Sequence, residues 1–169
     1  TALGSPAVIL TPIAEKDFIY SGAFRAGGGL VKLNSTNGGI EPEQIYFSPK
    51  LPIGLGGVVK VGAYFYGSTS QAYLCVEFAS GTVRWEERTS PAASFCADGR
   101  LYLHAENGDV ALVEPSPEGY REKGRFAPPG QPPRANQMEK AWAHPVVAHS
   151  RLYIRDVGKL WCYDVKAGR

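Results

Sequence analysis

Residues 100–114, RLYLHAENGDVALVE, contain a short apolar strand, an Asn-Gly turn and a second apolar strand that ends in an acid. Residues 151–164, RLYIRDVGKLWCYD, repeat this order around a Val-Gly turn, and looser copies begin at Phe18 and Tyr64. Two apolar strands on either side of a glycine-containing turn are typical of a β-hairpin. A hairpin pattern that recurs four times predicts one supersecondary unit, stacked so that neighbouring copies bury a shared core.

The four copies have the spacing of propeller blades. Aligned on the first hairpin strand, at Phe18, Tyr64, Leu101 and Leu152, they lie 46, 37 and 51 residues apart. The mean interval of about 45 residues is the length of a four-stranded propeller blade. We therefore expect an all-β protein, a β-propeller of about four four-stranded antiparallel blades.

The predicted blades fill a single domain over residues 1–169. Their approximate limits are 7–47, 51–87, 91–126 and 142–169. A proline-rich segment, residues 127–134, cannot donate a continuous ladder of hydrogen bonds, so it is predicted to be a loop. The last unit stops before an outer strand. The chain is therefore expected to be a small four-bladed ring, or a fragment or half of a larger, eight-bladed propeller, and the second alternative is favoured.

Each unit ends its second hairpin strand with an acceptor side chain, and a glycine follows four or five residues later. The pairs are Asn34 and Gly38, Glu77 and Gly81, Glu114 and Gly119, and Asp164 and Gly168. An acceptor side chain can close an Asx-like turn on its own backbone, and glycine can take a positive φ. These residues are predicted to build the turn of the repeat. Unrelated turns in a generic antiparallel protein would not explain why hairpin, acceptor and glycine recur together.

The second unit carries a recognisable motif. Residues 75–85, CVEFASGTVRW, resemble the repeat of pyrroloquinoline-quinone-type (quinoprotein-like) β-propellers, in which an acid precedes a Thr/Ser-Gly turn and a tryptophan follows. Residues 161–168 resemble the same repeat, cut before its tryptophan, and residues 33–38 match its turn, although Pro42 stands where the tryptophan would fall. The resemblance implies that Trp85 docks its blade against the next one.

The resemblance leaves the activity open. Family enzymes hold the quinone and a calcium ion through a Glu, Asn and Asp set, whereas this chain shows no dense carboxylate cluster of that kind. It is more similar to non-catalytic members such as the outer-membrane assembly propeller lipoprotein. We therefore expect a non-enzymatic scaffold for protein or ligand interaction, with no catalytic residue, metal or cofactor. The alternatives are part of a quinone- and calcium-dependent alcohol dehydrogenase, and a carbohydrate-binding propeller suggested by the many Tyr and Trp residues.

Two segments are candidate contact loops. Gly27, Gly28 and Gly29 are predicted to form a flexible hairpin tip. The proline-rich loop offers a second surface, and its candidate residues are Pro129, Gln131 and Arg134. The expected partner is a protein, the remaining blades of a parent protein, or a second copy in a homodimer. Analogy with the family indicates a bacterial protein of the periplasm or the cell exterior.

Composition excludes other classes of partner. The formal net charge is +2, and the basic residues form no stripe with interleaved aromatics, which argues against nucleic-acid binding. No run of 18 apolar residues predicts a membrane span, and no signal peptide is recognisable. The three cysteines, Cys75, Cys96 and Cys162, have no Cys-x-x-Cys spacing and are predicted to pack inside blades. His144 and His149 are five residues apart, which in a strand puts them on opposite faces and disfavours a shared metal.

Overall fold

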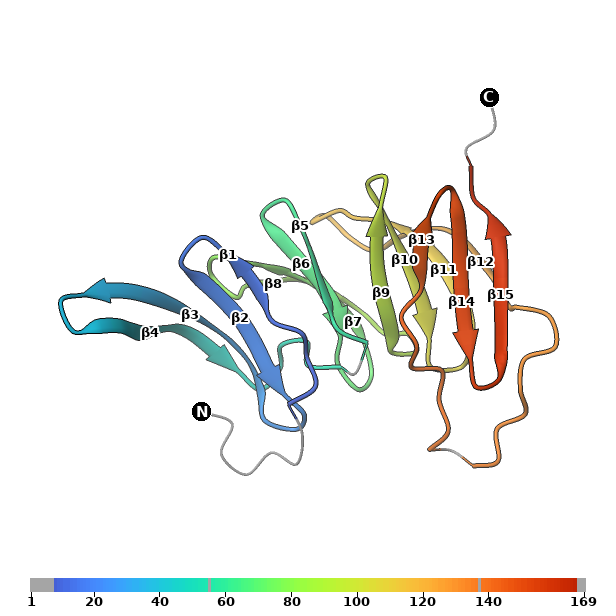
Figure 1. Ribbon diagram of the computed structural model, residues 1–169, viewed down its shortest axis with the longest axis horizontal. Coiled ribbons are helices and arrows are strands. Elements are labelled where there is room, and N and C mark those ends of the chain that lie inside the picture. The colour runs from blue at the N-terminus through green and yellow to red at the C-terminus, as the bar shows by residue number, and fades with distance from the viewer. Residues whose placement is uncertain (1–7, 55, 137, 167–169) are drawn as a thin grey trace.

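The computed structural model describes residues 8–54, 56–136 and 138–166. These residues form fifteen β-strands, and the described part of the chain contains no helix. The strands make three four-stranded sheets and one three-stranded sheet, and within each sheet neighbours in sequence are neighbours in space. All the pairings are antiparallel. Figure 1 shows the four sheets side by side in a row. The predicted all-β architecture is confirmed.

We number the sheets as blades in chain order. Blade 1 contains β1 (Ile13–Glu15), β2 (Phe18–Ala23), β3 (Gly27–Thr36) and β4 (Gly39–Ser48). Blade 2 contains β5 (Val58–Val61), β6 (Tyr64–Ser68), β7 (Tyr73–Glu77) and β8 (Val83–Glu87). Blade 3 contains β9 (Ala92–Ala97), β10 (Arg100–Ala105), β11 (Val110–Glu114) and β12 (Arg121–Phe126). Blade 4 contains β13 (Val146–Ala148), β14 (Arg151–Asp156) and β15 (Lys159–Asp164).

The hydrophobic core consists of three layers, one between each pair of adjacent blades. In the first layer, the ring centroids of Tyr20 and Phe65 lie 4.4 Å apart, and both side chains are fully buried. The second layer joins blade 2 to Leu101 and neighbouring residues of blade 3, and the third includes Leu152 of blade 4. Each interior sheet therefore buries both of its faces. We call the face toward the preceding blade the leading face, and the opposite one the trailing face.

A tyrosine occupies the same place on the trailing face of every blade. In each case it stands opposite a Leu or Cys of the third strand, and in blades 1 to 3 that residue stands opposite one on the fourth strand. We call these sets the cross-strand rows. They are Tyr20–Leu30–Tyr46, Tyr66–Cys75–Trp85, Tyr102–Leu112–Gly124 and, in blade 4, Tyr153–Cys162.

A β-bulge follows each of the first three rows. The register shifts directly after Leu30, Cys75 and Leu112, so that one extra residue is accommodated on the fourth strand. A bulge bends its strand and increases the local twist. Because it recurs next to the same row, it bends the fourth strand at the same point in blades 1 to 3.

Candidate functional site

Trp85 connects blade 2 to blade 3. Its indole Nε1 donates a hydrogen bond of 2.7 Å to the carbonyl oxygen of Ser116, in the loop between β11 and β12. The indole also lies 6.0 Å from the Tyr66 ring and 5.8 Å from the Tyr120 ring, measured between centroids. The side chain therefore packs on aromatic rings of both blades and bonds the backbone of the second.

Tyr46 makes the equivalent contact between blades 1 and 2. Its hydroxyl donates a hydrogen bond of 2.9 Å to the carbonyl oxygen of Phe78, in the turn after β7. Gly81 lies under the Tyr46 ring with φ 72°, and a Cβ placed there would be 2.7 Å from a ring carbon. The expected equivalence of Pro42 with Trp85 is therefore wrong. Tyr46 occupies that place because it ends the blade 1 cross-strand row, as Trp85 ends the row of blade 2.

The repeat acceptors do not share one role. The Asp164 carboxylate accepts the Lys166 N–H at 2.9 Å, which is an Asx-like turn. Glu77 accepts the Ser80 hydroxyl at 2.6 Å. The expected turn at Asn34 is wrong, because this residue lies within β3 and its Nδ2 donates to Glu43 at 2.9 Å.

The repeat glycines also differ. The Gly81 N–H donates to the carbonyl oxygen of Glu77 at 2.9 Å, and its φ is positive. Gly38 lies in the turn between β3 and β4, and Gly119 lies in the loop before β12, where a Cβ would meet nothing within 4 Å. Neither of these two has a positive φ. Gly168 lies outside the described residues.

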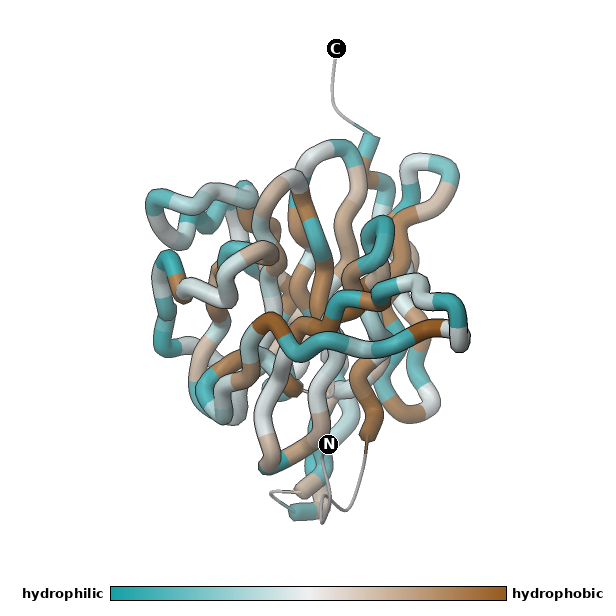
Figure 2. Tube along the Cα trace, turned by 90° about the vertical axis from the view of Figure 1, so that its left-hand side faces the viewer, coloured by the Kyte–Doolittle hydropathy of each residue, from teal (hydrophilic) through white to brown (hydrophobic). Residues whose placement is uncertain are grey.

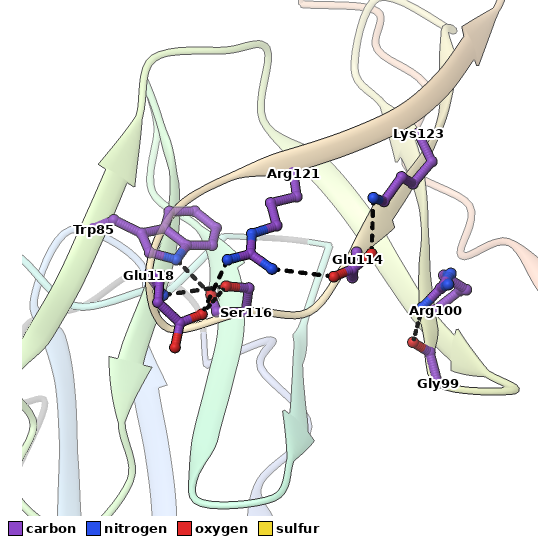
Figure 3. A network of polar contacts seen from close by, with 8 residues as sticks. All are labelled: Trp85, Gly99, Arg100, Glu114, Ser116, Glu118, Arg121 and Lys123. Carbon is purple, nitrogen blue, oxygen red and sulfur yellow. Dashed lines mark hydrogen bonds and ion pairs between the residues drawn. The ribbon is translucent and has the colours of Figure 1, made fainter.

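Glu114 holds the loop that carries Ser116. Its carboxylate forms ion pairs with Arg121 at 3.2 Å and with Lys123 at 2.8 Å, and these contacts lower its pKa. Figure 3 shows the network continuing from Arg121 to Glu118 and from there to Ser116, beside the Trp85 indole. A hydrogen bond from the Ser116 hydroxyl lowers the pKa of Glu118 as well. Exposed ion pairs contribute little stability, so the network chiefly orders the loop on which Trp85 docks.

The glycine run is not a hairpin tip. Gly27, Gly28 and Gly29 lie in β3, whereas the turn after β2 lies at residues 24–26. Gly27 and Gly28 are buried, and a Cβ on Gly28 would lie 2.2 Å from the Tyr20 hydroxyl oxygen. These glycines let β3 run close to Tyr20, whose hydroxyl donates to the Pro52 carbonyl at 2.8 Å.

The proline-rich loop lies against blades 3 and 4. The carbonyl oxygen of Pro129 accepts the Trp161 Nε1–H at 3.1 Å, and Gln131 Nε2 donates to the Gly108 carbonyl at 3.0 Å. The Arg134 guanidinium makes two hydrogen bonds, of 2.9 and 2.5 Å, to the carboxylate of Asp156, whose side chain is only 3% exposed. All three candidate contact residues of this loop are thus engaged within the chain.

Blade 1 presents an open leading face. The register places on it an apolar or neutral residue at each position and no charged one, including Ile19, Val31, Ile40 and Phe47. A groove of about 220 Å³ runs over this face, and Phe47 is 49% exposed. Figure 2 looks toward this end of the row and shows hydrophobic segments within the outer strands of blade 1.

Blade 4 presents an open trailing face. The register places Arg151, Tyr153 and Arg155 of β14 on it, beside Asp164, Cys162 and Leu160 of β15, with Asp164 opposite Arg151. Cys162 is exposed, so its expected place in a blade interior is wrong, whereas Cys75 in the equivalent row is fully buried by blade 3. Neither arginine has an ion pair within the described residues. A cleft of about 210 Å³ near Trp142 and Arg155 adjoins this face.

The described residues contain no group of three or more His, Cys, Asp or Glu placed to hold a metal ion. His104 is 1% exposed, and its Nδ1 lies 2.9 Å from the Ala143 carbonyl oxygen, which ties blade 3 to the segment before β13. Burial raises the pKa of the Cys75 and Cys96 thiols. No helix in the described ranges is long and apolar enough to cross a membrane.

Comparison with known proteins supports the architecture. No family model and no curated protein matches the chain. Among solved structures, the crystal structure of BamB from Moraxella catarrhalis is similar, with a TM-score of 0.61 at 13% sequence identity. The match covers 87% of this chain and 40% of the BamB chain, so the chain spans less than half of that structure. At this level of identity the likeness shows the fold alone: a partial β-propeller.

Two contacts escaped prediction from sequence. The role of Tyr46 was not predicted, because the number of residues between the paired positions of the third and fourth strands varies. The separation along the sequence is 16 residues from Leu30 to Tyr46 but 10 from Cys75 to Trp85. Counting from the turn glycine therefore fails in blade 1. Asp156 was not predicted to be a partner of Arg134. Every second residue of β14 is buried: Leu152, Ile154 and Asp156. An acid at the third of these inward positions is the one sign in the sequence that Asp156 needs a partner.

Replacing Trp85 by Phe is expected to destabilise the protein by about 1–2 kcal/mol, because the carbonyl of buried Ser116 loses its donor while the aromatic packing is largely kept. Urea unfolding followed by far-UV circular dichroism measures this change. Trp142→Phe is the matched control, since Trp142 is 48% exposed and should change the free energy of unfolding by less than about 0.5 kcal/mol. Equal effects of the two variants would contradict the docking role.

Replacing Arg134 by Gln should lower the free energy of unfolding by about 2 kcal/mol, because it leaves the Asp156 carboxylate buried without its cation. The loss should be smaller than for a fully buried ion pair, because the Arg134 side chain is partly exposed. The double variant Arg134→Gln/Asp156→Asn should recover much of this loss. Thermal and urea unfolding of both variants provide the measurement, with Arg88→Gln as a control at an exposed arginine that has no ion pair among the described residues. A double variant as unstable as the single one would be inconsistent with this account.

Proposed function

We propose that this chain is a non-enzymatic β-propeller scaffold that acts by binding proteins. The docking of blade on blade supports a rigid body, and the likeness to BamB supports the propeller architecture. The resemblance of residues 75–85 to quinoprotein-like repeats supports a bacterial protein of the periplasm or the cell exterior.

The open leading face of blade 1 carries the proposal. The equivalent residues of the later blades, Phe65, Leu101 and Leu152, are each at most 2% exposed, because the preceding blade covers them. Ile19 has no such cover within the described residues, and Ile40 and Phe47 extend the apolar surface along β4. Large exposed apolar surfaces on a folded domain mark sites of interaction.

A second copy of the chain fits this face. The described strand residues of the face are uncharged, so two copies can meet there without repulsion between like charges, and a two-fold axis lets one surface pair with itself. The trailing face of blade 4 fits it less well. Its Arg155 stands opposite Leu160 and would be desolvated against a surface with no acid to pair it, since Asp164 of the same face stands opposite Arg151. The proposed contact therefore joins blade 1 to blade 1.

The protein is accordingly expected to have twice its chain mass of 18.2 kDa in solution. Size-exclusion chromatography with light scattering measures this mass over a range of concentrations. Phe47→Glu should convert the dimer to a monomer, because it buries a charge in the contact. Met138→Glu changes an equally apolar side chain, 78% exposed, outside blade 1 and should leave the mass unchanged. A native monomer at all concentrations would rule out this contact.

The scaffold proposal also predicts an outcome in an enzyme assay. The purified protein, incubated with pyrroloquinoline quinone and calcium, should give no dye-linked oxidation of alcohols above a heat-denatured control. Turnover that depends on both additions, and that chelation of calcium abolishes, would replace the scaffold by the dehydrogenase alternative.

A further inference from the structure

The hairpin of β3 and β4 projects beyond the rest of blade 1 (Figure 1). Strand β2 and the loop before it bond β3 only as far as Leu33. In the described part of the chain, residues 34–36 and 39–41 therefore pair only with each other, as a two-stranded ribbon. Every residue from Ser35 to Glu41 is exposed. A two-stranded ribbon of this kind is marginally stable, so its tip should open more readily than the blades.

An Asn-Gly pair forms the turn of this ribbon. Asn37 and Gly38 lie between Thr36 and Gly39, which stand opposite each other at the ends of β3 and β4. The Asn37 side chain makes no hydrogen bond with any other described residue. The Gly38 N–H donates to the Thr36 hydroxyl at 3.3 Å, which is longer than a usual N–H···O bond. The side-chain amide and the backbone nitrogen of the pair are thus weakly held.

The same dipeptide at Asn107 and Gly108, in the turn between β10 and β11, is held firmly. The Asn107 side chain accepts the Asp109 N–H at 3.0 Å and donates to the Asp109 carboxylate at 3.0 Å. The Gly108 N–H donates to the Ala105 carbonyl at 2.8 Å, and the Gly108 carbonyl accepts the Gln131 side chain at 3.0 Å. Gly108 is also buried.

We propose that Asn37 is a site of spontaneous deamidation in the folded protein, and that the fold protects Asn107 from the same reaction. The Gly38 backbone nitrogen attacks Asn37 Cγ. The N–Cγ bond forms, the Cγ–Nδ2 bond breaks, and ammonia leaves with the proton of the Gly38 amide. Water then opens the succinimide ring. Its addition at Cγ leaves aspartate, and its addition at the main-chain carbonyl carbon of Asn37 leaves isoaspartate.

Either product changes the ribbon, and this consequence goes beyond the proposed scaffold function. Both products add a negative charge at the tip. Isoaspartate also adds one carbon atom to the main chain of a two-residue turn, and turn length fixes the register of a hairpin. We therefore expect isoaspartate to unpair Thr36 from Gly39. The reaction would alter the border of the open leading face, to which Ile40 belongs.

One sample of the native protein tests the proposal at both sites. The protein is incubated at mildly alkaline pH, digested at acid pH so that the digestion adds no deamidation, and analysed by peptide mapping with mass spectrometry. Asn37 should convert at least about tenfold faster than Asn107, because the hydrogen bonds of Asn107 and Gly108 must open before that pair can react. In concentrated urea, which removes the fold, the two sites should convert at similar rates.

A matched pair of variants tests the attacking group. Gly38→Ala should slow the conversion of Asn37 at least about tenfold, because a Cβ obstructs close approach of the backbone nitrogen. The change should not disturb the turn, since Gly38 has no positive φ and its Cβ would meet only the Thr36 hydroxyl oxygen, 4.0 Å away. Gly119→Ala makes the same change at another glycine without a positive φ and with free space, and it should leave the rate unchanged.

Three results would overturn the inference. The first is a native protein in which Asn37 converts no faster than Asn107. The second is an Asn37 that converts in urea but not in the native protein, and the third is an undiminished rate in Gly38→Ala. None of these results depends on the mass of the protein in solution. Failure of this inference and failure of the blade 1 contact are therefore distinguishable.

Discussion

The structure depends on a contact in which an aromatic side chain on the fourth strand of one blade bonds the backbone of the next blade. Tyr46 reaches the carbonyl of Phe78, and Trp85 reaches the carbonyl of Ser116. Each donor stands at the end of a cross-strand row, next to a bulge that turns the outer strand. An acceptor on the backbone does not depend on the side chain that carries it. The same contact can therefore recur although Phe78 and Ser116 have little in common.

The interface between blades 3 and 4 is held differently, because its row ends in Gly124 rather than in an aromatic residue. Phe126 packs edge-to-face on Tyr163 with ring centroids 4.9 Å apart, two residues further along β12. The proline-rich loop then crosses to blade 4, where Arg134 pairs with buried Asp156. Between blades 3 and 4, the proline-rich loop and the Arg134–Asp156 ion pair thus take the part that the Trp85 indole has between blades 2 and 3. The proline-rich loop thus lies between the one described pair of blades whose row lacks a docking ring.

The repeat made the fold predictable, because hairpin spacing reports the number and length of blades without any knowledge of their contacts. Phe18, Tyr64, Leu101 and Leu152 all fall in the second strand of their sheets. The exact alignment is wrong by one residue in blades 1 and 2, because Ile19 and Phe65, not Phe18 and Tyr64, take the position of Leu101 and Leu152. A shift of one residue moves a side chain to the other face of its sheet. Local roles were less predictable. The glycines at 27–29 resemble a flexible tip in sequence, and only the approach of the Tyr20 hydroxyl shows why side chains are excluded there. The position of Tyr46 depends on hairpin length, which residue types around the turn do not report.

The two ends of the row differ in chemistry, and this difference bears on which surfaces they can contact. Between adjacent blades, the trailing face of one blade packs on the leading face of the next. If the exposed faces of blades 1 and 4 were both apolar, the blade 4 face of one copy could pack in the same way on the blade 1 face of another. Here the leading face of blade 1 is neutral, whereas the trailing face of blade 4 carries Arg151 opposite Asp164 and Arg155 opposite the apolar Leu160. Burying those charges against a neutral surface is unfavourable. The unmatched charge of Arg155 therefore opposes contact between the trailing face of one copy and the leading face of another.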